Sequence, residues 1–427
     1  MIDRILGSAL LLAVFLSLLS SFYPVFPSVL AGVPLWFSAI IFFKRVKRNQ
    51  KIQVSILLGL GVTTLIAGLV RGADSSFVLK ALQANYSVAT MLLGVGFLRL
   101  LAASAVDGGA DKPHGIKALV TTMFGNHLFG SVLNMSSVII MGDKMAKNNR
   151  LTTVQGLTLL RAFSACAFWS PFFAAMGLTL VSAPGAQLMT LVVYGIPLSI
   201  TALLITSWQL SRSQDIESQT GYPIAFQSLW LPCLLAFAVI VCHYQYTSIS
   251  VLTLVTLISM GFTCLWLPLT RGRRGIHLIS DHVRFGIQAS GGEILLFASS
   301  ALLASGFAAL LATLPISLTP DVYEFKEAAI TLLILIAAAM IGMHPVTSVV
   351  LAGSLLSPSA TDPNLLGMTL LMGWSLGIVA SPFSGVQISI QSRYQISPIS
   401  LLKANSLYVP LMYMICLAII AFYSMLH

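Results

Sequence analysis

The sequence predicts an all-α polytopic membrane protein of about 11 transmembrane helices, organised as two inverted-topology repeats that each contain a re-entrant hairpin and a broken helix. Three observations support this fold class. Of the 427 residues, 57% are hydrophobic and only 8% are charged, with a mean hydropathy of +0.92. A Ser-Pro-Phe triplet interrupts two long apolar segments, at positions 211 residues apart. The distribution of basic residues around these segments also reverses between the two halves of the chain.

Hydropathy places the individual spans, because about 20 mostly apolar residues cross a bilayer as a helix, whereas a β-barrel shows shorter alternating segments. We expect the first span to be a retained helix, since no small-residue cleavage site follows it. Two further apolar stretches, 117–142 and 327–357, have polar or helix-breaking residues in their middle, and each either crosses once or enters and returns as a hairpin. The 11 expected spans are roughly 5–22, 26–43, 52–70, 80–106, 152–181, 186–207, 226–243, 247–269, 291–314, 363–391 and 401–424.

Basic residues decide the topology, because they concentrate in cytoplasmic loops. The run KRVKRNQK (44–51) predicts a cytoplasmic N-terminus. Two hairpins then place DKMAKNNR (143–150) and RGRRG (271–275) inside as well, whereas a single crossing by 117–142 would turn the first of these runs outward. We therefore expect both stretches to be re-entrant, the C-terminus to lie outside, and the chain to reside in the inner (plasma) membrane. The basic residues not assigned to the cytoplasm are Arg71, Lys80, Lys326, Arg99 and Arg161.

An internal repeat connects the two halves. Glycine, proline and serine rarely coincide by chance in one ungapped register, and a shift of 211 residues aligns many of them. The first half, 1–212, then holds a hairpin at 117–142 and a broken helix at 152–181, and the second half, 213–427, holds their counterparts at 327–357 and 363–391. The matched pairs include Ser137/Ser348, Gly142/Gly353, Gly156/Gly367, Thr158/Thr369, Ser164/Ser375, Ser170/Ser381, Pro171/Pro382 and Phe172/Phe383.

The charges predict that the two copies are inverted. The loop after the first hairpin is basic, but its counterpart SLLSPSATDPN (354–364) has no basic residue. The loop after the first broken helix, SAPGAQ (182–187), has none, whereas its counterpart QSRYQISPISLLK (391–403) has two. A parallel duplication would not reverse this bias.

The paired proline breaks at Pro171 and Pro382 indicate a binding site. Proline interrupts a helix, and the backbone groups that it frees cannot be satisfied by lipid, so the break must be buried in protein or line a wet cavity. Freed carbonyls suit a cation, and the N-terminus of a half-helix suits an anion. The alternative is a kink that only aids packing, but interrupted segments at corresponding places in two halves favour the site.

Neutral oxygens gather around these breaks and the hairpin turns. They suit Na⁺ or a hydrogen-bonded substrate, although serine and threonine also serve as helix-packing residues. After the second break, Ser381, Ser384 and Gln387 follow helical spacing and share one face with Gln391. The expected substrate-binding residues are Asn134, Ser136, Ser137, Ser170, Thr347, Ser348, Ser381, Ser384 and Gln387.

Ionisable residues within the apolar segments are few. His127 and His344 are either proton carriers or hydrogen-bonded structural residues. Arg161 either contacts an anion or extends its side chain to the cytoplasmic surface. The five cysteines lack the spacing of metal ligands, and no cofactor is expected. The coupling ion is expected to be either Na⁺ or H⁺. The net charge of +10 is explained by cytoplasmic loops, so no nucleic-acid partner is expected.

In this architecture the chain resembles the ion transporter superfamily, which includes divalent-anion/sodium symporters and arsenite permeases. The nearest matches to the Ser-Asn-Thr hairpin tips of the symporters are Asn134-Met135-Ser136-Ser137 and Pro345-Val346-Thr347-Ser348. The resemblance implies an elevator-type secondary carrier, in which the hairpins and broken helices move together as a transport domain.

The sequence therefore predicts a secondary active transporter, not an enzyme, that moves a small anion or polar organic solute. Its expected partners are that small molecule and the lipid bilayer, with a homodimer left open. The alternative is a membrane enzyme or lipid-handling protein of envelope synthesis, which usually has acidic and histidine clusters in large external loops. Here those loops are short and nearly free of such residues. A passive channel is a third alternative, although pores rarely need two internal hairpins.

Overall fold

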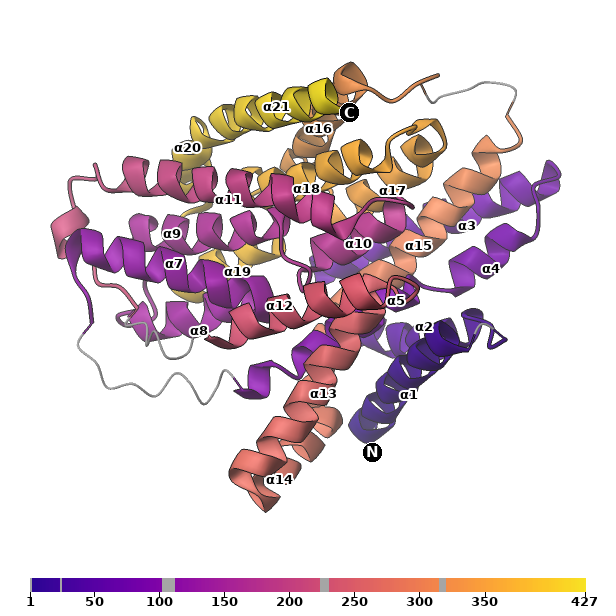
Figure 1. Cartoon of the computed structure of the whole chain (residues 1–427), viewed down its shortest axis with the longest axis horizontal. Helices are drawn as coiled ribbons and strands as arrows, with labels where there is room; N and C mark the ends of the chain where they lie inside the picture. The colour runs from indigo at the N-terminus through magenta and orange to yellow at the C-terminus, as the bar shows by residue number, and fades with distance from the viewer. Residues whose placement is uncertain (1, 24, 102–111, 223–229, 315–319) are drawn as a thin grey trace. The chain divides into compact units, whose positions relative to one another are not determined.

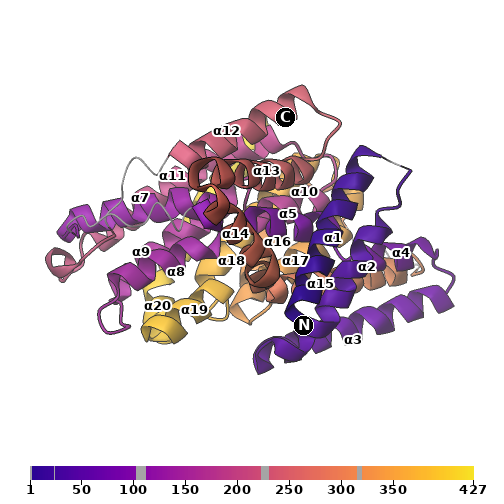
Figure 2. The ribbon, with the colours of Figure 1, turned by 90° about the horizontal axis from the view of Figure 1, so that it is seen from below.

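The computed structural model describes residues 2–23, 25–101, 112–222, 230–314 and 320–427, and the regular elements in these ranges are helices (Figures 1 and 2). Two isolated β-bridges, His114 with Thr220 and Lys147 with Arg150, are the exceptions. The chain folds into two compact units. Unit 1 contains Met1–Ala103, Phe237–Asp321 and Val350–Pro358, and unit 2 contains Ser104–Ala236, Val322–Val349 and Ser359–His427. Each unit thus combines segments from both halves of the sequence.

Among the described residues, eight helices are long and apolar enough to cross a membrane: Ile2–Phe22, Gln50–Val70, Ser76–Leu101, Leu188–Leu210, Val251–Arg271, Arg273–Leu311, Pro363–Tyr394 and Tyr408–Leu426. The chain is therefore an all-α, multi-pass membrane protein. Three further spans were expected, at 26–43, 152–181 and 226–243. The first forms the shorter helix α2 (Val29–Arg45, 17 residues), and the third forms α12 (Trp230–Gln245, 16 residues). The second, 152–181, is divided into several short helices. Residues 102–106 and 226–229 of the expected spans lie outside the described ranges.

Unit 1 is held together by close helix pairs. Helix α15 (Gly291–Leu311) packs along α3 (Arg48–Val70), and α13 (Val251–Arg271) packs along α5 (Tyr86–Gly96). Glycines allow this approach: a Cβ added at Gly306 would lie 2.3 Å from the Gly61 carbonyl oxygen. Small residues at helix contacts are the usual means of association where the surroundings are as apolar as the side chains. Helix α4 (Ser76–Leu82) also packs on α15.

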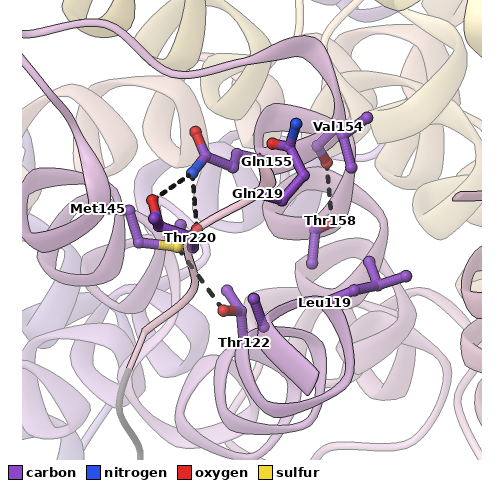
Figure 3. A pocket seen from close by; sticks show the side chains of 9 residues that line it. Leu119, Thr122, Met145, Val154, Gln155, Thr158, Gln219 and Thr220 are labelled. Carbon is purple, nitrogen blue, oxygen red and sulfur yellow. Dashed lines mark hydrogen bonds between the residues drawn. The ribbon is translucent and has the colours of Figure 1, made fainter. Parts of the chain in front are cut away.

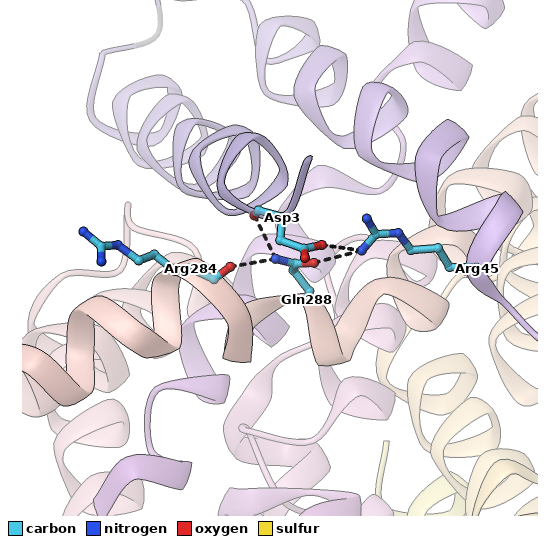
Figure 4. A network of polar contacts seen from close by, with 4 residues as sticks. All are labelled: Asp3, Arg45, Arg284 and Gln288. Atoms are coloured by element: carbon cyan, nitrogen blue, oxygen red, sulfur yellow. Dashed lines mark hydrogen bonds and ion pairs between the residues drawn. The ribbon is translucent and has the colours of Figure 1, made fainter. Parts of the chain in front are cut away.

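The N-terminal helix α1 (Ile2–Phe22) is tied to the rest of unit 1 by polar contacts at its first turn (Figure 4). The Arg45 Nη1 donates to Asp3 Oδ1 at 2.6 Å and to Gln288 Oε1 at 3.2 Å. The Gln288 Nε2 in turn donates to the backbone oxygens of Asp3 at 2.8 Å and Arg284 at 2.7 Å. These contacts join α1, α2 and the 3₁₀ turn η5 (Ile287–Ser290).

In unit 2 the stretch 117–142 forms two helices, α7 (Gly115–Leu133) and α8 (Met135–Met145). Between them Asn134 has φ +53° and ψ −143°, a backbone conformation that no helix contains. Thr122 and Met145 lie 12 residues before and 11 residues after this asparagine, yet their side chains are 3.7 Å apart. The chain therefore reverses direction at Asn134.

The stretch 327–357 also turns back. Helix α16 (Phe325–Met340) and helix α17 (Pro345–Leu356) are separated by a turn in which Gly342 has φ +100°, a conformation that glycine adopts without strain. The backbone N–H of Tyr323, before α16, donates to the carbonyl of Ser359, after α17, at 3.1 Å. Helix α17 is shared between the two compact units, which divide after Val349.

Two further segments of unit 2 are interrupted helices. The first consists of α9 (Thr153–Ser164), the 3₁₀ turn η1 (Ala165–Phe168) and α10 (Ala174–Ser182), and Pro171 lies in its gap. The second consists of α18 (Pro363–Ala380) and α19 (Gly385–Tyr394), with Pro382 in its gap. Every residue from Leu365 to Ala380 is buried, so α18 forms the core of this unit.

The remaining helices complete the chain. In unit 1 they are α14 (Arg273–Asp281) and the π-helical turn η4 (His282–Gly286), and in unit 2 they are α11 (Leu188–Leu210), η2 (Ile216–Ser218), α20 (Pro398–Asn405) and α21 (Tyr408–Leu426). The 3₁₀ turn η6 (Ser357–Ser359) lies where the chain passes from unit 1 to unit 2, after Pro358.

Candidate functional site

The two interrupted helices meet at residues that the shift of 211 residues aligns with each other. The Ser375 Oγ donates to the Ser164 carbonyl oxygen at 2.8 Å, and these residues are 211 positions apart. In a two-fold arrangement, equivalent residues can touch each other only close to the axis. The contact therefore lies where a pseudo-two-fold axis between α9 and α18 would pass.

Glycine contacts on either side of this point are reciprocal. A Cβ added at Gly156, in α9, would lie 2.4 Å from the Ile396 side chain, just after α19. A Cβ added at its counterpart Gly367, in α18, would lie 3.0 Å from the Leu191 side chain in α11 and 3.3 Å from the Ala186 Cβ, just after α10. Each interrupted helix thus packs its first half against the loop that follows the second half of the other.

Each hairpin tip lies at the break of an interrupted helix from the same half of the sequence. In the first half, the Asn134 Nδ2 donates to the Phe172 carbonyl oxygen at 3.2 Å. In the second half, a Cβ added at Gly342 would lie 3.4 Å from the Phe383 ring. Phe172 and Phe383 are the paired residues of the two Ser-Pro-Phe triplets. A hairpin tip therefore lies next to each of the two breaks.

Hydroxyl groups at the first break are occupied by backbone partners. Buried Ser170 donates through Oγ to the Ser131 carbonyl oxygen and accepts from the Phe172 N–H at 3.2 Å. Ser137 donates to the Asn134 carbonyl oxygen at 3.0 Å. Ser136, on the same turn, is half-buried. The expected residues of the first copy thus come together here, and two of their hydroxyls hold the turn in shape.

At the second break, side chains bind the carbonyls of the last turn of α18. The Ser384 Oγ donates to the Ile378 carbonyl at 2.9 Å, and the Gln387 Nε2 donates to the Ile378 and Val379 carbonyls at 3.1 and 2.8 Å. The Asn405 Nδ2 adds a further bond to Val379 at 3.2 Å. The sequence suggested that freed carbonyls would hold a cation, but these two already have protein donors. Ser381 accepts from the Phe383 N–H at 3.2 Å.

The Gln387 Oε1 is left without a partner by this arrangement. Gln387 is 1% exposed, and among the described residues its Oε1 has no hydrogen-bond donor. Both carbonyl contacts of its Nε2 fix the orientation of the amide, so Oε1 points away from α18. A buried acceptor of this kind is suited to a ligand that brings a donor or a cation, because leaving it unpaired is unfavourable.

His127 is bound in its neutral form. Its Nδ1 lies 3.0 Å from the Ala162 carbonyl oxygen, an acceptor, so this nitrogen carries the hydrogen. Its Nε2 lies 3.1 Å from the indole Nε1 of Trp169, which only donates, and Ser199 Oγ is also 3.1 Å away. A second proton on the ring would face the indole N–H. Of the two interpretations of this residue, the geometry favours a hydrogen-bonded structural histidine.

His344, in the second copy, lies at the start of α17. Its Nδ1 accepts from the backbone N–H of Val346 at 3.2 Å. The two expected residues that follow, Thr347 and Ser348, are buried, and Ser348 donates to the Pro345 carbonyl oxygen at 3.2 Å. This group therefore caps and stabilises the first turn after the hairpin tip.

Arg161 is enclosed by protein and does not extend to the surface. It is 1% exposed, and its guanidinium donates to Asn405 Oδ1 at 2.9 Å, Gln209 Oε1 at 2.7 Å and the Ala404 carbonyl at 2.8 Å. The ring of Tyr408 covers it at 4.1 Å from the centroid. This corrects the surface alternative, because neutral oxygens and an aromatic face replace the water that the charge would otherwise seek.

A small pocket lies at the base of the first hairpin (Figure 3). Its volume is about 10 Å³, and one of its lining residues is Gln155, whose Nε2 donates to the Thr220 carbonyl oxygen at 2.7 Å. That space holds about one water molecule, whereas ligand pockets usually measure about 300–1,000 Å³. None of the expected site residues lines it, so it is separate from the breaks. The lining residues are Ala118, Leu119, Thr122, Met145, Val154, Gln155, Thr158, Gln219 and Thr220.

Sequence reasoning missed Asn405 and Gln209, which complete the surroundings of Arg161. Both lie at ends of expected apolar spans, where a single polar residue carries no distinct signal. It also missed Asn126 as a site residue, although its Nδ2 binds the Leu159 carbonyl at 2.7 Å and its buried Oδ1 has no partner among the described residues.

Groups of acidic, histidine or cysteine side chains that could hold a metal are not found in the described part of the chain.

No protein-family model matches the chain, and comparison with curated proteins finds no match. Among solved structures, it is similar to the YdaH transporter of Alcanivorax borkumensis, with a TM-score of 0.54 and 13% identity over 87% of this chain and 98% of that chain. It is also similar to MtrF of Neisseria gonorrhoeae, which is described with a class of antimetabolite efflux pumps, with a TM-score of 0.53 and 13% identity over 87% of this chain and 95% of that chain. At this identity the likeness establishes the fold, which the chain shares with these membrane transporters.

Proposed function

We propose that the chain is a secondary active transporter for a small anion or polar organic solute. The observation that carries this proposal is the duplicated break, each with a hairpin tip beside it. Helices interrupted at corresponding positions of two repeats are the usual construction of a transporter binding site. The fold shared with YdaH and MtrF, both described as transport proteins, supports the same conclusion.

The substrate is proposed to bind where the two breaks approach the pseudo-two-fold contact of Ser164 and Ser375. Gln387 is its main polar contact, because its Oε1 is a buried acceptor without a partner among the described residues. Asn134, Ser136 and Ser381 at the tips and breaks contribute further polar atoms. The remaining hydroxyls at these turns maintain the shape of the site through their backbone bonds.

Na⁺ is the proposed coupling ion. The alternative, H⁺, would require a group that changes its protonation during transport, and the candidates are His127 and His344. His127 is held by partners that suit only its neutral form, and the Nδ1 of His344 accepts from the backbone N–H of Val346. Backbone carbonyls and hydroxyls can replace part of the hydration shell of Na⁺ without any such change.

Unit 2 is proposed to be the moving part of an elevator mechanism. It contains the first hairpin, both interrupted helices and the first part of the second hairpin, up to Val349. The N-terminus is proposed to lie in the cytoplasm and the C-terminus outside, in accordance with the basic loops. This arrangement requires the two hairpins to enter from opposite sides of the membrane.

The experiment that tests this function uses the purified, reconstituted protein. A panel of small carboxylates and polar solutes is first screened for thermal stabilisation with and without Na⁺, and each hit is then assayed for uptake into proteoliposomes. We expect a hit to be taken up along an imposed Na⁺ gradient, and Gln387→Leu to lower its uptake at least tenfold. Gln53→Leu, in α3 of unit 1 and outside both breaks, is the control. Uptake that responds neither to a Na⁺ gradient nor to a pH gradient would contradict secondary active transport.

A further inference from the structure

The corner between α13 and α14 in unit 1 has an exposed basic face. Gly272 has φ +54° and turns the chain sharply, and Gly275 then lies so close to α13 that an added Cβ would be 2.3 Å from the Leu267 carbonyl oxygen. The corner is therefore fixed in shape by two glycines. The basic side chains exposed on and beside it are Arg271, Arg273, Arg274 and Arg284.

These arginines have no anionic partner in the described part of the chain. Ion pairs there join Arg45 to Asp3 and Arg393 to Asp143, and neither involves the corner. Figure 4 shows that Arg284 contributes only its backbone oxygen to the network around Gln288, while its guanidinium extends away from it. Asp281 is the one acidic residue between 271 and 290, so the corner keeps a net positive charge.

Apolar side chains are exposed beside this charge. Leu269 is 81% exposed, Ile276 56% and Phe285 59%. On α14, helical spacing places Arg273, Arg274 and His277 on one face and Ile276 and Ile279 on the other. A short helix with arginines on one face and large apolar side chains on the other lies in the plane of a membrane interface.

We propose that the α13–α14 corner is a binding site for the headgroups of anionic phospholipids. The arginines would bind the phosphate, as guanidinium groups do bidentately, while Leu269, Ile276 and Phe285 enter the acyl region beneath it. A lipid is the occupant that matches both the charge and the adjacent apolar surface; a free phosphate would use only the charge. The site lies outside the transport machinery proposed above and does not depend on it.

The test measures lipid selectivity of the full-length protein. Purified protein in mixed micelles with phosphatidylglycerol and phosphatidylcholine is analysed by native mass spectrometry, which counts the lipids that stay bound. We expect a preference for phosphatidylglycerol that weakens at high salt. A basic residue near an anionic surface contributes about fivefold in affinity, so R273Q/R274Q should lower the apparent affinity for phosphatidylglycerol about 25-fold.

Two controls define the result. R71Q/K80Q removes the same charge from exposed residues of α4 and the end of α3, and should change the affinity less than twofold. Glycerol phosphate at millimolar concentration should not displace the bound lipid; displacement would show a free-phosphate site and overturn the proposal. Equal losses in both double variants, or no lipid preference in the parent protein, would also overturn it. If R273Q/R274Q does not fold, R271Q/R284Q serves as the test variant with the same expected direction.

Discussion

At the scale of single residues, hydrogen-bond direction distinguishes structural from functional roles. His127 has an acceptor on one nitrogen and a donor on the other, so its neutral form is fully paired. Gln387 has its amide hydrogens paired and its oxygen unpaired among the described residues. The histidine is therefore part of the framework, whereas the glutamine keeps a buried acceptor that the proposed substrate would use.

His127→Gln is expected to lower stability without altering the ion dependence of uptake. Glutamine cannot satisfy both the Ala162 carbonyl and the Trp169 indole at once, and an unpaired buried group costs about 1–3 kcal/mol. The unfolding free energy of the reconstituted protein measures this loss, with His427→Gln at the exposed C-terminus as control. A variant of unchanged stability whose uptake no longer responds to pH would instead establish His127 as a proton carrier.

Asp143 gives a pH-dependent prediction outside the apolar segments. Its carboxylate accepts from Arg393 at 2.8 and 2.7 Å and from Tyr394 at 2.9 Å, and the bond from Arg393 lowers the pKa of Asp143 below its usual 3.8. A lowered pKa in the folded state stabilises the protein above about pH 4, and this contribution is lost as the pH falls through the folded pKa.

Asp143→Asn should therefore cost about 0.2–1 kcal/mol at neutral pH, since both side chains are half exposed, and progressively less below pH 4. A double-mutant cycle with Arg393→Gln isolates the pair. A cost that stays constant as the pH is lowered would show that the ion pair does not stabilise the fold.

At the scale of secondary-structure elements, close glycine contacts fix how the hairpins pack. A Cβ added at Gly142, in α8, would lie 2.4 Å from the Tyr394 Oη, and that hydroxyl is held by bonds to Ile139 and Asp143. The ring has little freedom to withdraw. The contact thus sets the separation of α8 and α19, and with it the position of the first hairpin tip.

Gly142→Ala is expected to destabilise the protein by about 1–3 kcal/mol through overpacking. Gly261→Ala in α13 is the matched control, because no atom lies within 4 Å of its added Cβ and alanine favours the helix by up to about 1 kcal/mol. Thermal unfolding of both variants, side by side, measures the difference. Equal stability of the two would show that α8 and α19 can separate freely.

Elements could be predicted well from the sequence because their signals are local. Apolar runs marked the spans, and proline marked the gaps between α9 and α10 and between α18 and α19. Side-chain partners could not be predicted, because they depend on the tertiary arrangement. Arg161 binds Asn405, 244 residues away, and no local pattern links them. The same holds for Gln387, whose spacing indicated a ligand-binding face but not that its amide hydrogens would bind the end of α18.

At the scale of the whole molecule, we propose that two inverted repeats build one site from two breaks. The contact between Ser164 and Ser375 and the reciprocal glycine contacts support a pseudo-two-fold relation within unit 2. Such a relation, with its axis in the membrane plane, requires corresponding loops to face opposite sides of the membrane. The loops after the two hairpins are the pair to compare.

Cysteine labelling in sealed, right-side-out vesicles tests this claim most directly. Cys233, Cys242 and Cys264 are first replaced by serine, while Cys166 and Cys416 are buried and remain. Lys147→Cys and Thr361→Cys are then introduced separately at exposed loop positions and treated with a membrane-impermeant maleimide. We expect Thr361→Cys to react in intact vesicles and Lys147→Cys to react only after permeabilisation. Reaction of both from the same side would contradict the inverted repeat.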